Sequence, residues 1–141
     1  MTGLDSAAPK ATLVHVFPGA FCGVPTIVGH YLVQSVPSIH GYIVLDIADG
    51  TRPVEVSRLT ISDKYSPHWT GWDPVSHRLV VTSGQPGDRM YLLKLDEGTG
   101  KLSIDEAFRG DDGKPGFSFA TREWPHGWTG EGKPHGAVFS R

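Results

Sequence analysis

Two stretches of the chain repeat each other at a nearly constant distance, and this repeat restricts the fold more than any other feature. Residues 30–33, 43–47 and 53–56 have counterparts 47, 48 and 48 residues later, in the same order. Each repeat holds short apolar segments separated by turn residues, and no segment has the apolar spacing of an amphipathic helix. The pattern predicts an all-β protein built from repeated four-stranded units.

Turn residues separate the expected strands. These strands fall at residues 22–28, 31–36, 42–47 and 54–60 in the first unit, and at 68–72, 79–82, 90–95 and 102–108 in the second. Asp73-Pro74-Val75-Ser76 is a Pro-led turn in the second unit. A later turn, residues 96–100, carries glycines that tolerate positive φ. Both turns favour antiparallel hairpins.

Units of this kind are typical of β-propeller blades. A blade is a sheet of four short antiparallel strands encoded by roughly 40 to 50 residues. One blade cannot bury both of its faces, so blades pack face to face around a central axis. We expect two complete blades, at residues 21–61 and 66–109.

The flanking segments predict incomplete blades. Residues 11–16 have the composition of an outer strand from an earlier blade. Residues 110–133 contain eight glycines or prolines and predict a long loop. Residues 134–140 repeat the phase of 67–69 and predict a closing inner strand. The fold prediction is therefore a β-propeller fragment, two complete four-stranded blades plus flanking single strands, whose remaining blades come from a longer chain or a second copy of this one.

Composition narrows the range of partners. The formal net charge is −2 and no basic stripe is present, which argues against nucleic acid as the main partner. No apolar run approaches the roughly 20 residues that a membrane helix needs. The chain has one cysteine, Cys22, so it forms no internal disulfide. The partner classes that we expect are a small-molecule ligand and, within the ring, the remaining propeller blades or a second copy of the chain.

Three segments resemble known propeller repeats. Residues 42–56, YIVLDIADGTRPVEV, resemble the LVIVD-type repeat. Pro67-His68-Trp69 and Pro134-His135-Gly136 resemble the Pro-His-Gly start of the YVTN-type repeat, from which Trp69 departs. The pairing of residues 45–59 with residues 91–108 also looks like the C-terminal region of selenium-binding-protein-like propellers. The resemblance implies a histidine-bound metal and an oxidoreductase similar to methanethiol oxidases, but it places no catalytic residue in this chain.

Three histidines are candidate metal ligands. His68, His126 and His135 each follow a proline, and His68 and His135 fall at the same phase of successive units. In a propeller, that phase lies where the inner strand meets the channel mouth, so two such imidazoles would point toward one axis. Imidazoles converging there could bind copper, zinc or iron. In the alternative interpretation, Pro-His-Gly is a strand-entry device whose imidazole binds a neighbouring blade's backbone.

Three tryptophans are candidate ligand-binding residues. Trp69 follows His68, and Trp124 and Trp128 flank His126 in the long loop. Aromatic rings near a channel mouth can stack on a ligand, whereas in the alternative interpretation they fill the core or the space between blades.

Two functions of different classes follow. In the first, the chain is the C-terminal portion of a β-propeller that binds a small molecule or metal at its channel mouth. In the alternative, it is a non-catalytic propeller that acts as a protein-interaction platform, with residues 110–133 as the docking surface. The fold alone does not choose between them, so whether the chain is an enzyme stays open. Alanine at His68 and His135 would abolish only the first function.

Overall fold

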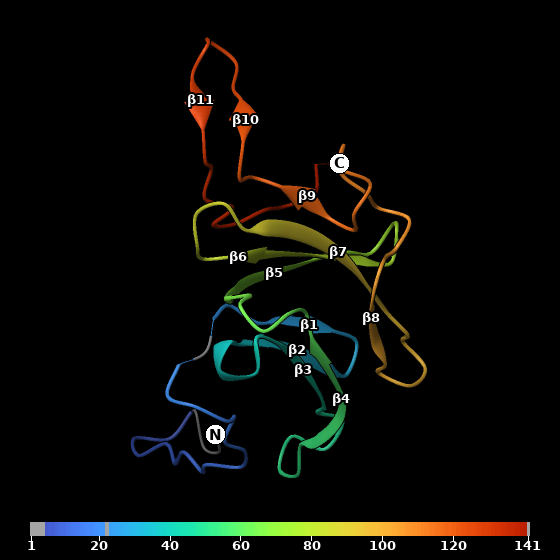
Figure 1. Ribbon diagram of the computed structural model, residues 1–141. Helices are drawn as coiled ribbons and strands as arrows, with labels where there is room; N and C mark the ends of the chain where they lie inside the picture. Colours follow the sequence, from blue (N-terminus) through green and yellow to red (C-terminus); the bar gives the residue numbers. More distant parts are fainter. Residues whose placement is uncertain (1–4, 22, 141) are drawn as a thin grey trace.

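Antiparallel hairpins build two sheets that follow one another along the chain (Figure 1). The computed structural model describes residues 5–21 and 23–140. Within these residues it contains no α-helix and a single 3-10 helix, η1 (Pro37–Ile39). The predicted all-β class is confirmed. No helix in the described part of the chain is long and apolar enough to cross a membrane.

The first sheet has the strand order β1 (Thr26–Val28), β2 (Tyr31–Val36), β3 (Gly41–Asp46) and β4 (Val54–Thr60). Each strand pairs antiparallel with the next. The central strands β2 and β3 are apolar at most positions because both faces of this sheet are buried. β1 is shorter than predicted, since residues 23–25 are not in the strand, and Cys22 lies outside the described residues.

The second sheet has the strand order β5 (Pro67–Asp73), β6 (Arg78–Ser83), β7 (Arg89–Leu95) and β8 (Leu102–Ile104). β6 begins and ends 47 residues after β2, the spacing of the sequence repeat. The predicted turns are formed. The Asp73 carboxylate accepts a hydrogen bond from the Val75 amide at 3.0 Å, and the Asp96 carboxylate accepts one from the Gly98 amide at 2.9 Å.

β8 ends earlier than predicted because Asp105 turns inward. Its side chain is fully buried and lies 2.9 Å from Nε of Arg78 and 2.9 Å from Nζ of Lys94. Burial alone would raise the pKa of Asp105, but the hydrogen bonds from Lys94 and from the Ala107 amide, with the charge of Arg78, lower this pKa below its usual range. The carboxylate therefore ties β6 and β7 to the residues that follow β8.

One apolar core lies between the two sheets. Its buried side chains come from both sheets and from the segment that connects them: Val28, Tyr31, Val33, Tyr42, Val44, Tyr65, Leu79, Val81, Leu93, Leu95 and Leu102. Two pairs of equivalent strands lie side by side, since β1 contacts β5 and β4 contacts β8, and β2 also contacts β5. At the outer strands, the Leu102 amide donates to the Ser57 hydroxyl at 3.0 Å. The two sheets are thus docked in matching orientation.

Two tyrosines form a polar pair inside this core. The hydroxyls of Tyr42 and Tyr65 are 3.4 Å apart, and the Tyr65 ring also packs edge-on against Tyr91 at 5.6 Å. Burial raises the pKa of both Tyr42 and Tyr65 because an ionised phenolate would lose its hydration. Both phenols are therefore neutral in the folded protein.

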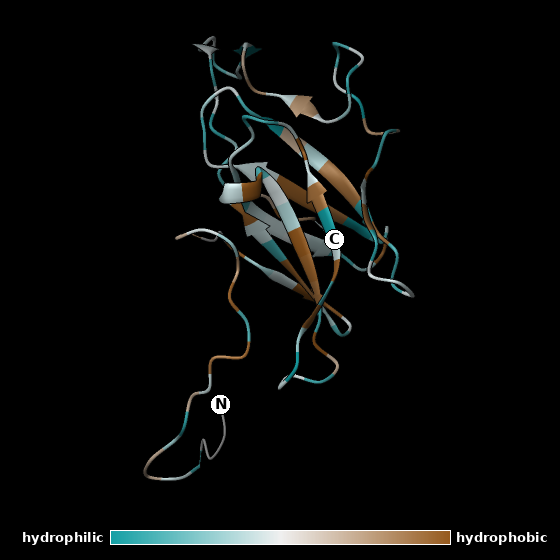
Figure 2. Cartoon of the chain, turned by 60° about the horizontal axis from the view of Figure 1, so that its bottom comes forward, coloured by the Kyte–Doolittle hydropathy of each residue, from teal (hydrophilic) through white to brown (hydrophobic). Residues whose placement is uncertain are grey.

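Segments near the two chain ends lie on the outer faces of the sheets. Phe17 packs against a second buried cluster, Val36, Ile43 and Leu45, on the face of the first sheet that points away from the second. Figure 2 shows the N-terminal segment, partly apolar, running on beyond the sheets. Residues 11–16 and 134–140, both predicted as strands, form none. An extended segment becomes a strand only by pairing with a free strand edge, and both segments lack such a pairing.

The predicted loop 110–133 contains short strands. β9 (Phe117–Ser118) pairs with the start of β7, and β10 (Arg122–Glu123) pairs with β11 (Thr129–Gly130). The β10–β11 hairpin projects from the end of the second sheet (Figure 1). The Gly87 amide donates to the Gly132 carbonyl at 3.0 Å, which joins the base of the hairpin to the β6–β7 turn.

Candidate functional site

A β-bulge sets the position of His68. The register between β5 and β6 shifts between Pro67 and Trp69, so His68 has no partner opposite it. Bulges redirect side chains and are frequent next to functional sites. The His68 carbonyl accepts two hydrogen bonds from the first sheet segment, from the Val24 amide at 2.7 Å and from the Ser35 hydroxyl at 3.1 Å. The bulge is therefore locked to the neighbouring sheet.

His135 lies against His68. The two imidazole centroids are 4.4 Å apart and the rings are inclined by 42°. His135 is exposed and His68 is half-buried. Nδ1 of His68 is buried and has no hydrogen-bond partner among the described residues. The His68 ring packs over Gly84, and a Cβ added to this glycine would lie 3.4 Å from the ring. The structure thus brings together two of the three predicted metal ligands.

The contact that places His135 repeats the contact that places His68. The Thr82 hydroxyl donates to the His135 carbonyl at 3.0 Å, and Ser35 makes the same bond to His68. Ser35 and Thr82 are 47 residues apart, on β2 and β6. The segment around His135 therefore packs against the second sheet in the same way that the start of β5 packs against the first sheet. This segment forms no strand.

Trp69 holds the segment around His135 in place. Its Nε1 donates a hydrogen bond to the Ala137 carbonyl at 2.8 Å. Gly136 lies over the ring, and a Cβ added to this glycine would be 3.5 Å from the ring. The ring is half-buried and does not lie beside the other two predicted ligand-binding tryptophans. Its observed role is packing between β5 and the C-terminal segment.

His126, Trp124 and Trp128 lie together in the hairpin. The two indole centroids are 6.0 Å apart and their planes differ by 35°. The two indoles line an open hollow of about 700 Å³. Its wall also includes Pro125, His126, Glu131 and Lys133. His126 thus lines this hollow and does not join the histidine pair. Among the described residues, no group of three or more His, Cys, Asp and Glu side chains could hold a metal ion.

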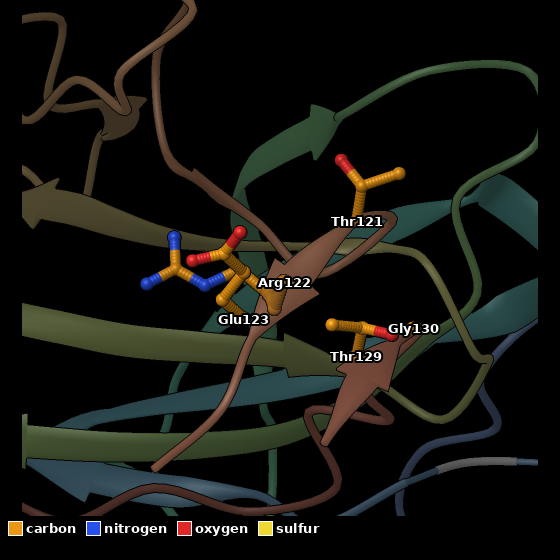
Figure 3. A pocket seen from close by; sticks show the side chains of 5 residues that line it. All are labelled: Thr121, Arg122, Glu123, Thr129 and Gly130. Carbon is orange, nitrogen blue, oxygen red and sulfur yellow. The ribbon is translucent and has the colours of Figure 1, made fainter. Parts of the chain in front are cut away.

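A second hollow lies on the two strands of the hairpin. It is lined by Thr121, Arg122, Glu123, Thr129 and Gly130, and Figure 3 shows these residues on β10, on β11 and directly before β10. Arg122 is partly engaged elsewhere, since its guanidinium lies 4.0 Å from the centroid of the Phe117 ring. This hollow contains no converging set of acids, bases or nucleophiles.

Sequence reasoning missed a polar pair near His68. The buried Ser83 hydroxyl donates a short hydrogen bond to the Asp88 carboxylate and accepts the Gln85 amide at 3.0 Å. Ser83 pairs with Pro67, directly before His68. The signal was present in the sequence Ser83-Gly-Gln-Pro-Gly-Asp88, because Ser and Asp flanking Gly and Pro typically bind their own turn. The pair fixes the β6–β7 turn beneath the histidines.

Comparison of the chain with models of protein families, with curated proteins and with solved structures found no significant match.

Proposed function

We propose that this chain forms two neighbouring blades of a β-propeller and the inner-strand position of a third. The proposal is supported by the side-by-side arrangement of equivalent strands and by the hydrogen bond that Ser35 and Thr82 both make. It also accounts for the LVIVD-type and YVTN-type sequence patterns. The remaining blades would come from a longer chain or from a second copy of this one.

The function supported best is binding of a small molecule or a transition metal by His68 and His135 at the channel mouth. The observation that carries this proposal is the close imidazole pair, whose centroids are 4.4 Å apart and in which Nδ1 of His68 is buried with no partner in the part of the chain that the structure describes. A buried polar atom without a hydrogen bond costs free energy, about 1–3 kcal/mol. A bound ligand that reached this nitrogen would remove that cost.

The two imidazoles fit part of a metal site. Imidazole nitrogen is a common ligand of copper, zinc and iron. Protein zinc sites use three or four side chains, so His68 and His135 would supply two donors and neighbouring blades the others. The Ser83–Asp88 pair lies at the base of the β6–β7 turn and would keep His68 in position.

Metal analysis tests this function. We expect the intact ring, with the blades that complete it, to retain metal when purified after growth with copper, zinc and iron, and His68→Ala and His135→Ala each to lose it. His126→Ala and His30→Ala are controls, because neither residue contacts the histidine pair. A content below about 0.1 metal ion per chain, or equal retention by all four variants, would exclude the metal version. Loss in His126→Ala would place that histidine in the same site.

The second candidate function is a non-catalytic interaction platform. It is favoured by exposed apolar residues in the N-terminal segment, where Leu13 is 80% and Val16 70% exposed. Exposed apolar patches often mark protein-interaction sites. Under this function, the double variant His68→Ala/His135→Ala would keep its partner, whereas Leu13→Ser/Val16→Ser would lose it.

A further inference from the structure

The hollow between Trp124 and Trp128 has the properties of a separate ligand site. It is a wide, open hollow of about 700 Å³, against which a ligand could lie with one side in solvent. It is formed entirely by the hairpin and the residues after it, and the histidine pair contributes nothing to its wall. An inference about this hollow therefore does not depend on the proposed propeller function.

The backbone of the hairpin holds Trp124 and Trp128 opposite each other. The Trp124 amide donates to the Trp128 carbonyl at 2.7 Å, and the Gly127 amide donates to the Trp124 carbonyl at 3.2 Å. The tight turn needs positive φ at His126 and Gly127, both at 79°. Because these bonds place the two tryptophans on the same turn before any ligand arrives, the loss of backbone entropy on binding is reduced.

Neighbouring residues also pack against the Trp124 ring. The Phe119 ring packs against it at 6.1 Å, and Gly132 lies so close that a Cβ there would be 2.6 Å from the indole. Trp128 has no such cover and is 61% exposed. The exposed Trp128 ring offers a flat apolar surface for stacking beside the supported Trp124 ring.

The polar groups around the rings point to a neutral, hydroxyl-rich ligand. The side chains of Glu131, Lys133 and His126 make no hydrogen bond or ion pair within the described residues. Glu131 offers an acceptor and Lys133 a donor, and their charges cancel. A quaternary ammonium ion fits poorly, because two rings inclined by 35° form a trough rather than a cage, and Lys133 would repel it. Single-stranded nucleic acid needs a basic groove, which a hollow containing Glu131 does not provide.

We propose that this hollow binds a carbohydrate. The apolar face of one sugar ring would stack on Trp128, and the neighbouring ring would contact Trp124. Hydroxyl groups at the edge of the sugar would donate to the Glu131 carboxylate and accept from the Lys133 ammonium. A sugar combines a flat apolar face with a rim of hydroxyls, which is the pattern that the two indoles and the two charged side chains complement.

Titration of the full chain with soluble oligosaccharides tests the proposal. The probes are cellohexaose, xylohexaose, chitohexaose and maltohexaose, followed by calorimetry and tryptophan fluorescence. We expect at least one to bind, with Trp128→Ala weakening binding by about tenfold or more and Trp128→Phe by less. Glu131→Gln should weaken binding and leave the fold unchanged. Val138→Ala is the matched control, since Val138 is an 83% exposed apolar residue outside the hollow.

Three results would overturn the proposal. The first is no binding of any probe up to about 10 mM. The second is binding that Trp128→Ala leaves unchanged. The third is a Trp128 fluorescence emission typical of a buried indole in the protein without ligand. This emission is obtained as the difference between the spectra of wild type and Trp128→Phe. It would mean that protein already covers the ring.

Discussion

Ser35 and Thr82 donate the same hydrogen bond from equivalent strands of the two sheets. The Ser35 hydroxyl is 3.1 Å from the His68 carbonyl, and the Thr82 hydroxyl is 3.0 Å from the His135 carbonyl. Both hydroxyl residues are buried. The first bond docks one sheet on the other, and the second docks the C-terminal segment, so one device repeated in the sequence positions both histidines.

Removal of either hydroxyl should destabilise the fold. We expect Ser35→Ala and Thr82→Val to lower the free energy of unfolding by about 1 kcal/mol each, because each removes one hydrogen bond between packed segments. The His68 carbonyl keeps the bond from the Val24 amide in Ser35→Ala. Urea denaturation measures the change. Ser103→Ala, at an exposed position on β8, is the control and should change stability by less than about 0.5 kcal/mol. Stability equal to wild type in Thr82→Val would show that this bond does not hold the C-terminal segment.

The sequence predicted the parts of the fold that depend on local pattern. The positions of β2, β4 and β6 follow from apolar runs bounded by turn residues, and Asp73 and Asp96 cap turns as their neighbours indicated. The proximity of His68 to His135 followed from their common phase in the repeat. These features are encoded within a few residues or by the repeat length itself.

Features that depend on distant partners were not predictable in this way. Residues 11–16 and 134–140 have strand-like composition but pair with no strand edge. Residues 134–140 are instead held by contacts with Trp69 and Thr82, far away in the sequence. His126 lies apart from the other two histidines because the β10–β11 pairing carries it into the hairpin, and no local signal fixes the direction of that hairpin.

The buried carboxylate of Asp105 should make stability depend on acidic pH. Its pKa is lowered in the folded state, so its contribution is complete above the unfolded-state pKa of about 3.9 and is lost as the pH falls through the lower folded-state value. Asp105→Asn should cost about 2–3 kcal/mol at pH 7, because Arg78 and Lys94 lose their charged partner.

Urea denaturation at pH 7 and near pH 3 compares the two proteins. The loss of stability on acidification should be smaller in Asp105→Asn than in wild type, since the other carboxylates titrate in both. Equal losses in both proteins would mean that Asp105 does not carry this dependence.

The buried tyrosine pair should make stability depend on alkaline pH. The pKa values of Tyr42 and Tyr65 are raised in the folded state, so their contribution is complete below the unfolded-state pKa of about 10 and is lost as the pH rises above it. Tyrosinate absorbance should show these two phenols ionising only together with unfolding. In Tyr42→Phe, the fall of stability at high pH should be shallower. Ionisation of every tyrosine before any loss of far-UV circular dichroism would contradict the burial of this pair.

Arg89 should be the residue that orders the segment between β8 and the hairpin. Its guanidinium donates to both carboxylate oxygens of Asp112, at 2.7 and 3.0 Å, and to the carbonyls of Pro115 at 2.9 Å and Gly116 at 2.8 Å. Lysine keeps the charge but cannot form this planar set of bonds.

We expect Arg89→Lys to lower the free energy of unfolding by about 1–3 kcal/mol and to speed proteolytic cleavage within residues 110–116. Limited proteolysis followed by mass spectrometry locates the cleavage. Arg52→Lys, at an exposed position in the β3–β4 turn, is the control and should be cleaved like wild type. Because Arg89 starts the strand that pairs with β9, its replacement should also loosen the base of the β10–β11 hairpin. Unchanged cleavage in Arg89→Lys would show that the β7–β9 pairing alone is enough to order this segment.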